Sequence, residues 1–268
     1  MKDVQLTGVP QTLLLPLAAN FYENNRHDCI LYDETVNTVV DKLDLDLSFF
    51  CPDSFPQLGM MVRRRLFDNQ VKKYLKSYPN STVVNLGAGL CTRFFRMKTK
   101  NLRWFNIDLP QVEPLWRTAF TENGQFRFIG ASAFETGWYE KIPKDQHLLF
   151  ISEAMLCYHN RTETQKLFQN LLWRFKKFHF IFDVYNDSGV KRSNQNPDIA
   201  KSGSALQWGV KKIEDLKQLN DALTILDTDN FPWRYVTRLP FKEKIKSLFC
   251  PGIRNRFTVV HTRFSTDS

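Results

Sequence analysis

The sequence is poor in cysteine, and the few cysteines it has are badly placed for cross-linking. It contains five in 268 residues, at Cys29, Cys51, Cys91, Cys157 and Cys250, with no C-x-x-C pair. A disulfide framework needs paired cysteines and a zinc site needs closely spaced ligands, so neither is indicated. A reducing compartment suits such a chain, and we expect a cytoplasmic protein without a bound metal.

Long apolar runs are also missing. The longest, TLLLPLAA, is far too short to span a bilayer, and the first ten residues have no apolar stretch like that of a signal peptide. Internal repeats and low-complexity tracts are absent as well. We therefore expect neither a membrane anchor nor a membrane partner.

Positive charge and phenylalanine are what the sequence has in excess. The formal net charge is +9, and aromatic residues make up 14% of the chain, with 23 Phe. The basic residues are scattered in short pieces and no RNA-binding module is visible, so a solvated basic exterior is expected and nucleic acid is not. An acidic partner or substrate is the alternative. The many aromatic residues favour a deep core or an apolar pocket.

The first 80 residues are predicted to be a helical lead-in. Apolar residues recur at helical spacing over residues 10–24, with Pro16 inside the pattern, and again after Asp33, a candidate N-cap. A longer helix is predicted over residues 57–78. We assign residues 1–80 to an N-terminal helical cap.

From residue 81 onward, short apolar runs alternate with helical patterns. This alternation predicts a doubly wound α/β fold whose mostly parallel sheet has seven strands, the last of them antiparallel. The polar stretch 186–211 has little that could enter a core and is predicted to be a loop or lid, while helices are expected over 162–177 and 212–219. The expected strands are 82–86, 102–108, 126–130, 147–152, 178–184, 222–227 and 257–264.

The first expected strand runs into the glycines of VVNLGAG. These glycines predict a tight turn whose backbone comes close to a ligand or to the next helix. A dinucleotide site needs G-x-G-x-x-G, but only Gly87 and Gly89 are present and Thr92 stands in the third position. Asp108, at the end of the next strand, is the acidic residue that ribose recognition requires. A helix from about Leu90 would direct its free N–H groups at a ligand.

S-adenosylmethionine satisfies both observations, because it has a ribose but no pyrophosphate. A short G-x-G turn also arises for structural reasons alone, so the residues by themselves leave the choice open.

Six segments taken together resemble the leucine carboxyl methyltransferase family, in its bacterial polyketide O-methyltransferase branch of the tetracenomycin type. The resemblance covers nearly the whole chain in the same order. It implies a class I, Rossmann-like, S-adenosylmethionine-dependent O-methyltransferase acting on a carboxylate or phenolic hydroxyl of a small, polyketide-like molecule. The segments are LTGVPQTLLLPLA (6–18), VVNLGAGLCTRFFR (83–96), FNIDLPQV (105–112), ASAFETGWYE (131–140), LFISEAMLCY (149–158) and QWGVKK (207–212).

The resemblance also implies which residues bind the cofactor. The family's glycine motif falls on Gly87, Ala88 and Gly89, against the methionine part, and Asp108 matches the residue for the ribose hydroxyls. Arg64 matches the arginine for the cofactor carboxylate, with the register open by one because arginines flank it on both sides.

Two further matches concern the adenine and the mouth of the site. Ser132 and Ala133 fall where the family contacts adenine, and Glu153 falls near the amino end of the cofactor. Protein carboxyl methyltransferases of the family have an Asp-Leu pair in place of Ser132 and Ala133, which favours the small-molecule branch. Cys91 replaces an Asp of the family's glycine motif, which puts ordinary cofactor affinity in doubt.

The acceptor side is harder to predict. Tyr158 and Trp208 are candidates for an apolar substrate pocket, with a core position as the alternative. His159 is the one histidine expected near the mouth, where a surface role is favoured over catalysis, so no catalytic residue is assigned. Two other functions stay open: a protein carboxyl methyltransferase acting on an acidic, C-terminal carboxylate, and a degenerate member that binds cofactor without turnover.

Overall fold

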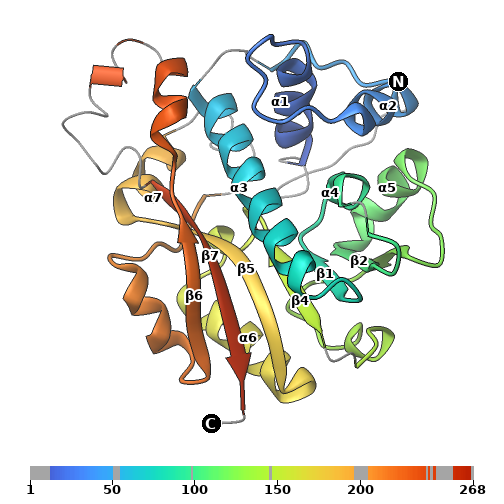
Figure 1. Ribbon diagram of the computed structural model, residues 1–268, viewed down its shortest axis with the longest axis vertical. Coiled ribbons are helices and arrows are strands. Elements are labelled where there is room, and N and C mark those ends of the chain that lie inside the picture. The colour runs from blue at the N-terminus through green and yellow to red at the C-terminus, as the bar shows by residue number, and fades with distance from the viewer. Residues whose placement is uncertain are drawn as a thin grey trace.

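The computed structural model describes residues 13–50, 55–97, 99–144, 147–195, 205–239, 241, 244–245 and 256–266. Its centre is one seven-stranded sheet in the order β3-β2-β1-β4-β5-β7-β6 (Figure 1). The strands are β1 Thr82–Leu86, β2 Arg103–Asp108, β3 Phe126–Gly130, β4 Leu148–Ser152, β5 Lys177–Tyr185, β6 Leu223–Asp229 and β7 Phe257–Ser265.

Strands β1 to β5 pair in parallel, and β7 runs antiparallel to both β5 and β6. The chain lays down β2 and β3 on one side of β1, then crosses over to place β4 on the other side. The strand order therefore reverses between β1 and β4, and in such sheets the ligand crevice lies outside the carboxyl ends at this point. The doubly wound sheet with an antiparallel last strand is confirmed.

Both faces of the sheet are covered, which explains the continuous apolar runs of the strands. Val83 joins the core beneath α1, α2 and α3, whereas its neighbour Val84 joins the core beneath α6. Parallel strands buried on both faces lose the alternation of apolar and polar residues. Figure 1 shows α3 in front of the sheet and α6 behind it. The helices are α1 Leu14–Asn24, α2 Glu34–Leu43, α3 Phe55–Ser77, α4 Arg93–Arg96, α5 Glu113–Ala119, α6 Arg161–Phe175 and α7 Asp187–Asn194.

Hydrogen bonding in the first turn explains where the N-terminal helices begin. Pro16 lies in the first turn of α1, where backbone N–H groups have no partner within the helix, so its missing N–H does no harm. Asp33 caps α2 as predicted, because its side chain accepts a hydrogen bond from the Thr35 N–H at 3.2 Å. The predicted start of the first helix at residues 10–12 lies outside the described residues.

The helix expected from Leu90 is wrong. The chain first makes a turn, closed by the Cys91 N–H donating to the Ala88 carbonyl at 3.0 Å, and α4 begins only at Arg93 and has four residues. A helix this short offers no extended dipole to a ligand. Binding at this loop therefore depends on the turn itself and on side chains.

Two other expectations need correction. Residues Ile213–Leu219 form a 3-10 helix instead of an α-helix. The stretch 186–211 is not all loop, because α7 occupies its first part; Asn186 caps that helix by accepting from the Gly189 N–H at 2.6 Å. Residues 196–204 lie outside the described part. Among the described residues, no helix has both the length and the apolar composition to cross a bilayer.

Candidate functional site

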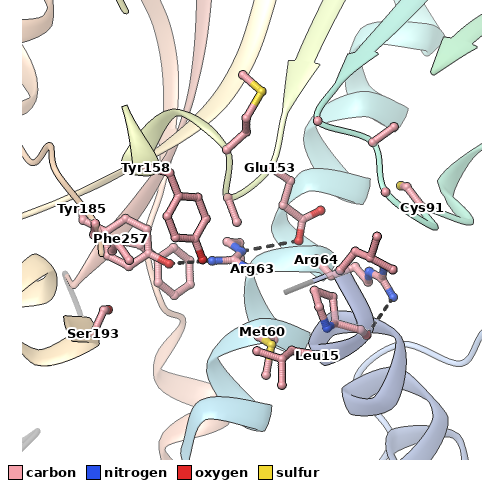
Figure 2. Close-up of a pocket in the computed structure, with 18 of the residues that line it drawn as sticks. Leu15, Met60, Arg63, Arg64, Cys91, Glu153, Tyr158, Tyr185, Ser193 and Phe257 are labelled. Carbon is pink, nitrogen blue, oxygen red and sulfur yellow. Dashed lines mark hydrogen bonds and ion pairs between the residues drawn. The ribbon is translucent and has the colours of Figure 1, made fainter. Parts of the chain in front are cut away.

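A cavity of about 640 Å³ opens at the carboxyl ends of β1, β2, β4 and β5, where the reversal of strand order predicts a ligand. This volume lies within the range of small-molecule sites. Figure 2 shows its walls, to which α1, α3 and the start of β7 contribute. The sequence-predicted residues that line it are Arg64, Gly87, Ala88, Gly89, Asp108, Ser132, Ala133, Glu153 and Tyr158.

The glycine loop has a backbone that only glycine adopts readily. Gly87 has φ +63° and Gly89 has φ +49°. A Cβ at Gly87 would also lie 2.9 Å from side-chain atoms of Met155. The loop is held to β2, since the Gly87 N–H donates to the Ile107 carbonyl at 2.9 Å. Backbone can therefore approach a ligand closely here.

Asp108 joins this loop to the end of β2. Its Oδ2 accepts from the Gly89 N–H at 2.6 Å and its Oδ1 accepts from the Leu109 N–H at 2.7 Å. Burial nevertheless raises the pKa of Asp108, so further hydrogen-bond donors would stabilise the carboxylate. Each carboxylate oxygen has a second lone pair to offer, and a ribose diol supplies the donors that would fit.

Arg64 lines the cavity and has a donor without a partner among the described residues. Its Nη1 donates to the Asn20 Oδ1 at 2.8 Å and to the Pro16 carbonyl at 3.4 Å, while its buried Nε has no partner among the described residues. Burial lowers the pKa of Arg64. A ligand carboxylate would supply the missing charge and acceptor, so an amino-acid carboxylate fits here.

Arg63, the neighbour of Arg64, is engaged differently. Its Nε lies 3.4 Å from the Glu153 Oε1, and its Nη1 lies 2.6 Å from the Tyr185 hydroxyl and 3.6 Å from the Asp183 Oδ2. Figure 2 shows the two guanidinium groups directed to opposite sides, Arg63 toward Tyr185 and Arg64 toward α1. The structure thus favours Arg64 in the register that the sequence left open.

Glu153 follows β4 and lies between two arginines. Its Oε2 accepts from the Arg93 Nη2 at 2.5 Å, in addition to the contact with Arg63. Burial by itself would raise the pKa of Glu153, but the charges of Arg93, Arg63 and Arg64 outweigh it and the pKa is lowered. Glu153 is therefore an anion at neutral pH and a weak base.

A chain of ion pairs continues from Glu153 into the protein. Arg93 is completely buried and its Nε also donates to the Asp68 Oδ1 at 2.7 Å. Arg96 reaches the same carboxylate, with its Nε 2.6 Å from the Asp68 Oδ2, and also pairs with Asp33 at the start of α2. These contacts fix α2, α3 and α4 around the glycine loop. Sequence reasoning missed this network, although Arg93 lies within the segment that carried the resemblance.

Of the remaining predicted residues, all but Trp208 line the cavity. Ser132 and Ala133 line the cavity beyond Asp108, and Tyr158 and His159 line it after β4. His159 packs on Phe134, with ring centroids 4.0 Å apart. Burial lowers the pKa of His159.

Trp208 does not line the cavity. It is buried in the core beneath α6, and its backbone N–H donates to the Cys157 carbonyl at 3.3 Å. The prediction of a substrate contact for Trp208 is therefore not supported. Cys91 lines the cavity, and its sulfur accepts from the Arg93 Nη1 at 3.6 Å.

Comparisons with known proteins relate the chain to methyltransferases in sequence and in fold. A sequence model of leucine carboxyl methyltransferases matches residues 16–172. Tetracenomycin polyketide synthesis O-methyltransferase TcmP of Streptomyces glaucescens is 24% identical over 217 residues, which cover 81% of this chain and 80% of that protein.

Two solved structures share the fold. A DUF574 family protein of Streptomyces avermitilis superposes with a TM-score of 0.60 over 93% of this chain and 96% of that one, at 9% identity. Magnesium protoporphyrin IX methyltransferase (ChlM) of Synechocystis PCC 6803, with bound SAH, gives a TM-score of 0.52 over 87% and 95%, at 12% identity. At such identities the likeness shows the Rossmann-like fold alone.

Proposed function

The chain belongs to the leucine carboxyl methyltransferase family, and from this premise we propose that it transfers a methyl group from S-adenosylmethionine to an oxygen of a small molecule. The acceptor oxygen is that of a carboxylate or a phenolic hydroxyl. The polyketide O-methyltransferase among its relatives supports the small-molecule assignment. S-adenosylmethionine supplies a methyl group on a sulfonium, which the acceptor oxygen attacks in line.

The cavity residues divide among the parts of the cofactor. Arg64 binds the carboxylate, the backbone of Gly87, Ala88 and Gly89 lies along the methionine part, and Asp108 accepts from the ribose hydroxyls. The buried, unpartnered Nε of Arg64 and the raised pKa of Asp108 support these two roles.

Three other cavity residues contact the adenine and the ammonium group of the cofactor. Ser132 and Ala133 border the adenine, and the half-buried Ser132 retains a hydroxyl on the cavity wall. Glu153 accepts from the ammonium group, since a carboxylate held by two guanidinium groups still has free lone pairs.

The chemistry of the walls favours a carboxylate acceptor over a phenol. A carboxylate is ionised at pH 7, whereas a phenol, with a pKa near 10, profits from a base. Glu153 is a weak base because its pKa is lowered by its arginine partners, and His159 is directed to Glu163, with Nδ1 and Oε2 3.4 Å apart. The protein's task is then to hold donor and acceptor in line, and positioning can supply much of the acceleration.

One observation carries the proposal: Arg64 and Asp108, which come from different elements, lie in the wall of a single cavity with both glycines of the loop. Arg64 needs a carboxylate, and Asp108 needs hydroxyl donors. S-adenosylmethionine presents both groups on one molecule.

Calorimetric titration with S-adenosylhomocysteine tests this proposal. The wild type is expected to bind one molecule per chain. Asp108→Ala removes the acceptor of two ribose hydrogen bonds and is expected to weaken binding at least about a hundredfold, since hydrogen bonds to a charged group contribute about 1.5–3 kcal/mol each.

The matched control is Asp41→Ala, which removes an exposed carboxylate on α2, away from the cavity. Its affinity should equal that of the wild type. A wild type that binds no S-adenosylhomocysteine would contradict the proposal outright.

A further inference from the structure

Tyr185 lies at the carboxyl end of β5 and lines the cavity, and its hydroxyl is directed at Arg63 (Figure 2). It lines the cavity together with Tyr158 and Phe257, and the rings of Tyr185 and Phe257 have centroids 6.4 Å apart (Figure 2). The cofactor roles proposed above use Arg64, the glycine loop, the ends of β2 and β3, and Glu153 after β4. The wall around Tyr185 is therefore left for the acceptor.

The hydrogen bond between Arg63 and Tyr185 has a fixed direction. A guanidinium has donors only, so the Arg63 Nη1 donates and the Tyr185 oxygen accepts, over 2.6 Å. The hydroxyl proton of Tyr185 is then free to donate elsewhere, and the part of the chain that the structure describes records no acceptor for it. The polar end of a half-buried tyrosine is thus available to a ligand in the cavity.

The surroundings keep this hydroxyl protonated and in place. Burial raises the pKa of Tyr185, although Arg63 opposes the shift, so the group is a donor and not a base at neutral pH. Arg63 is itself held by Glu153 and Asp183, at 3.4 and 3.6 Å. A donor backed by a fixed cation is suited to an oxyanion, because the positive charge behind it strengthens its hydrogen bond.

We infer that Tyr185 binds the acceptor by donating its hydroxyl hydrogen bond to the oxyanion that receives the methyl group, and that Arg63 is the positioning residue behind it. This inference rests on the function proposed above and adds the group that recognises the acceptor. The aromatic rings beside Tyr185 fit an acceptor whose anionic group is attached to a planar ring system.

The test uses the protein saturated with S-adenosylhomocysteine and three aromatic carboxylates as probes: benzoate, 1-naphthoate and 2-anthroate. At least one probe is expected to bind the wild type, and Tyr185→Phe should bind it about tenfold more weakly, as expected for a lost hydrogen bond to an anion. The affinity for S-adenosylhomocysteine should stay within about twofold, because no cofactor role is given to Tyr185. Tyr139→Phe is the matched control, since the Tyr139 hydroxyl is buried away from the cavity in the core beneath α6.

Three results would overturn the inference: equal probe affinity in wild type and Tyr185→Phe, no binding of any probe to the wild type, or an equal loss of probe and S-adenosylhomocysteine affinity in the variant. The last would make Tyr185 merely structural. Failure of the wild type to bind S-adenosylhomocysteine is a different result, which contradicts the proposed function.

Discussion

At the scale of single residues, the glycine loop shows how backbone conformation restricts the sequence. Gly87 and Gly89 both have positive φ, and Gly87 also faces the Met155 side chain at close range. The sequence could predict this pair, because two glycines directly after a buried strand are typical of a tight turn with positive φ. It could also predict Asp108, whose place at the end of β2 follows from the strand pattern.

Other residues could not be assigned from the sequence. Arg64 stands between two arginines, and the direction of each depends on the packing of α3 against α1, which no local pattern specifies. Trp208 is a candidate for the pocket or the core in the sequence, because an aromatic residue looks alike in either place, and the structure places it in the core. Tyr185 received no prediction for the same reason.

Gly87→Ala is expected to reduce both stability and cofactor affinity. The new Cβ combines an unfavourable positive φ with contacts of 2.9 Å to Met155, and the free energy of unfolding should fall by about 1–3 kcal/mol. Urea unfolding and titration with S-adenosylhomocysteine measure the two effects. Gly137→Ala is the control, because a Cβ there meets nothing within 4 Å. Similar losses in both variants would contradict the account of the loop.

At the scale of elements, the strands and long helices followed from periodicity, whereas the short helices did not. α4 is polar at both ends and its start depends on the preceding turn, and α7 has no apolar periodicity but is begun by the Asn186 cap. The contacts between elements were equally hidden. Asp68 of α3 holds two arginines of α4, and nothing in the sequence pairs these helices.

Asp68→Ala is expected to lower the free energy of unfolding by about 3–5 kcal/mol, because it leaves the buried Arg93 and Arg96 without their shared carboxylate. Lys73→Ala is the comparison. It breaks an ion pair with Asp227 in which the lysine side chain is 69% exposed, and the loss should be much smaller because solvent screens such pairs. Urea unfolding at pH 7 compares the two. Equal losses would show that the network does not stabilise the fold.

The loss of stability caused by Asp68→Ala is expected to depend on pH. Burial opposes ionisation of Asp68, but Arg96 and Arg93 prevail and lower its pKa to about 2. A carboxyl whose pKa is lower in the folded state stabilises that state fully above its unfolded pKa, which is 3.8 here. This contribution to the free energy of unfolding is lost as the pH falls toward 2. The difference between the wild type and Asp68→Ala should therefore shrink between pH 4 and pH 2.

At the scale of the whole molecule, the site is assembled from segments distant in the sequence. Helices α1 and α3 and the start of β7 all contribute residues to the wall of the cavity. The fold class was predictable because alternating strands and helices permit few topologies. The acceptor side was not, because it depends on how α7, β5 and β7 meet.

Methyl transfer itself tests the central claim most directly. The purified protein is incubated with methyl-labelled S-adenosylmethionine and an extract of the cells that produce it, and the label is followed in the small-molecule and protein fractions. We predict label in small molecules only, most of it released as methanol by mild alkali, as expected of a carboxylate methyl ester. Label in the protein fraction, or cofactor binding with no transfer at all, would contradict the account.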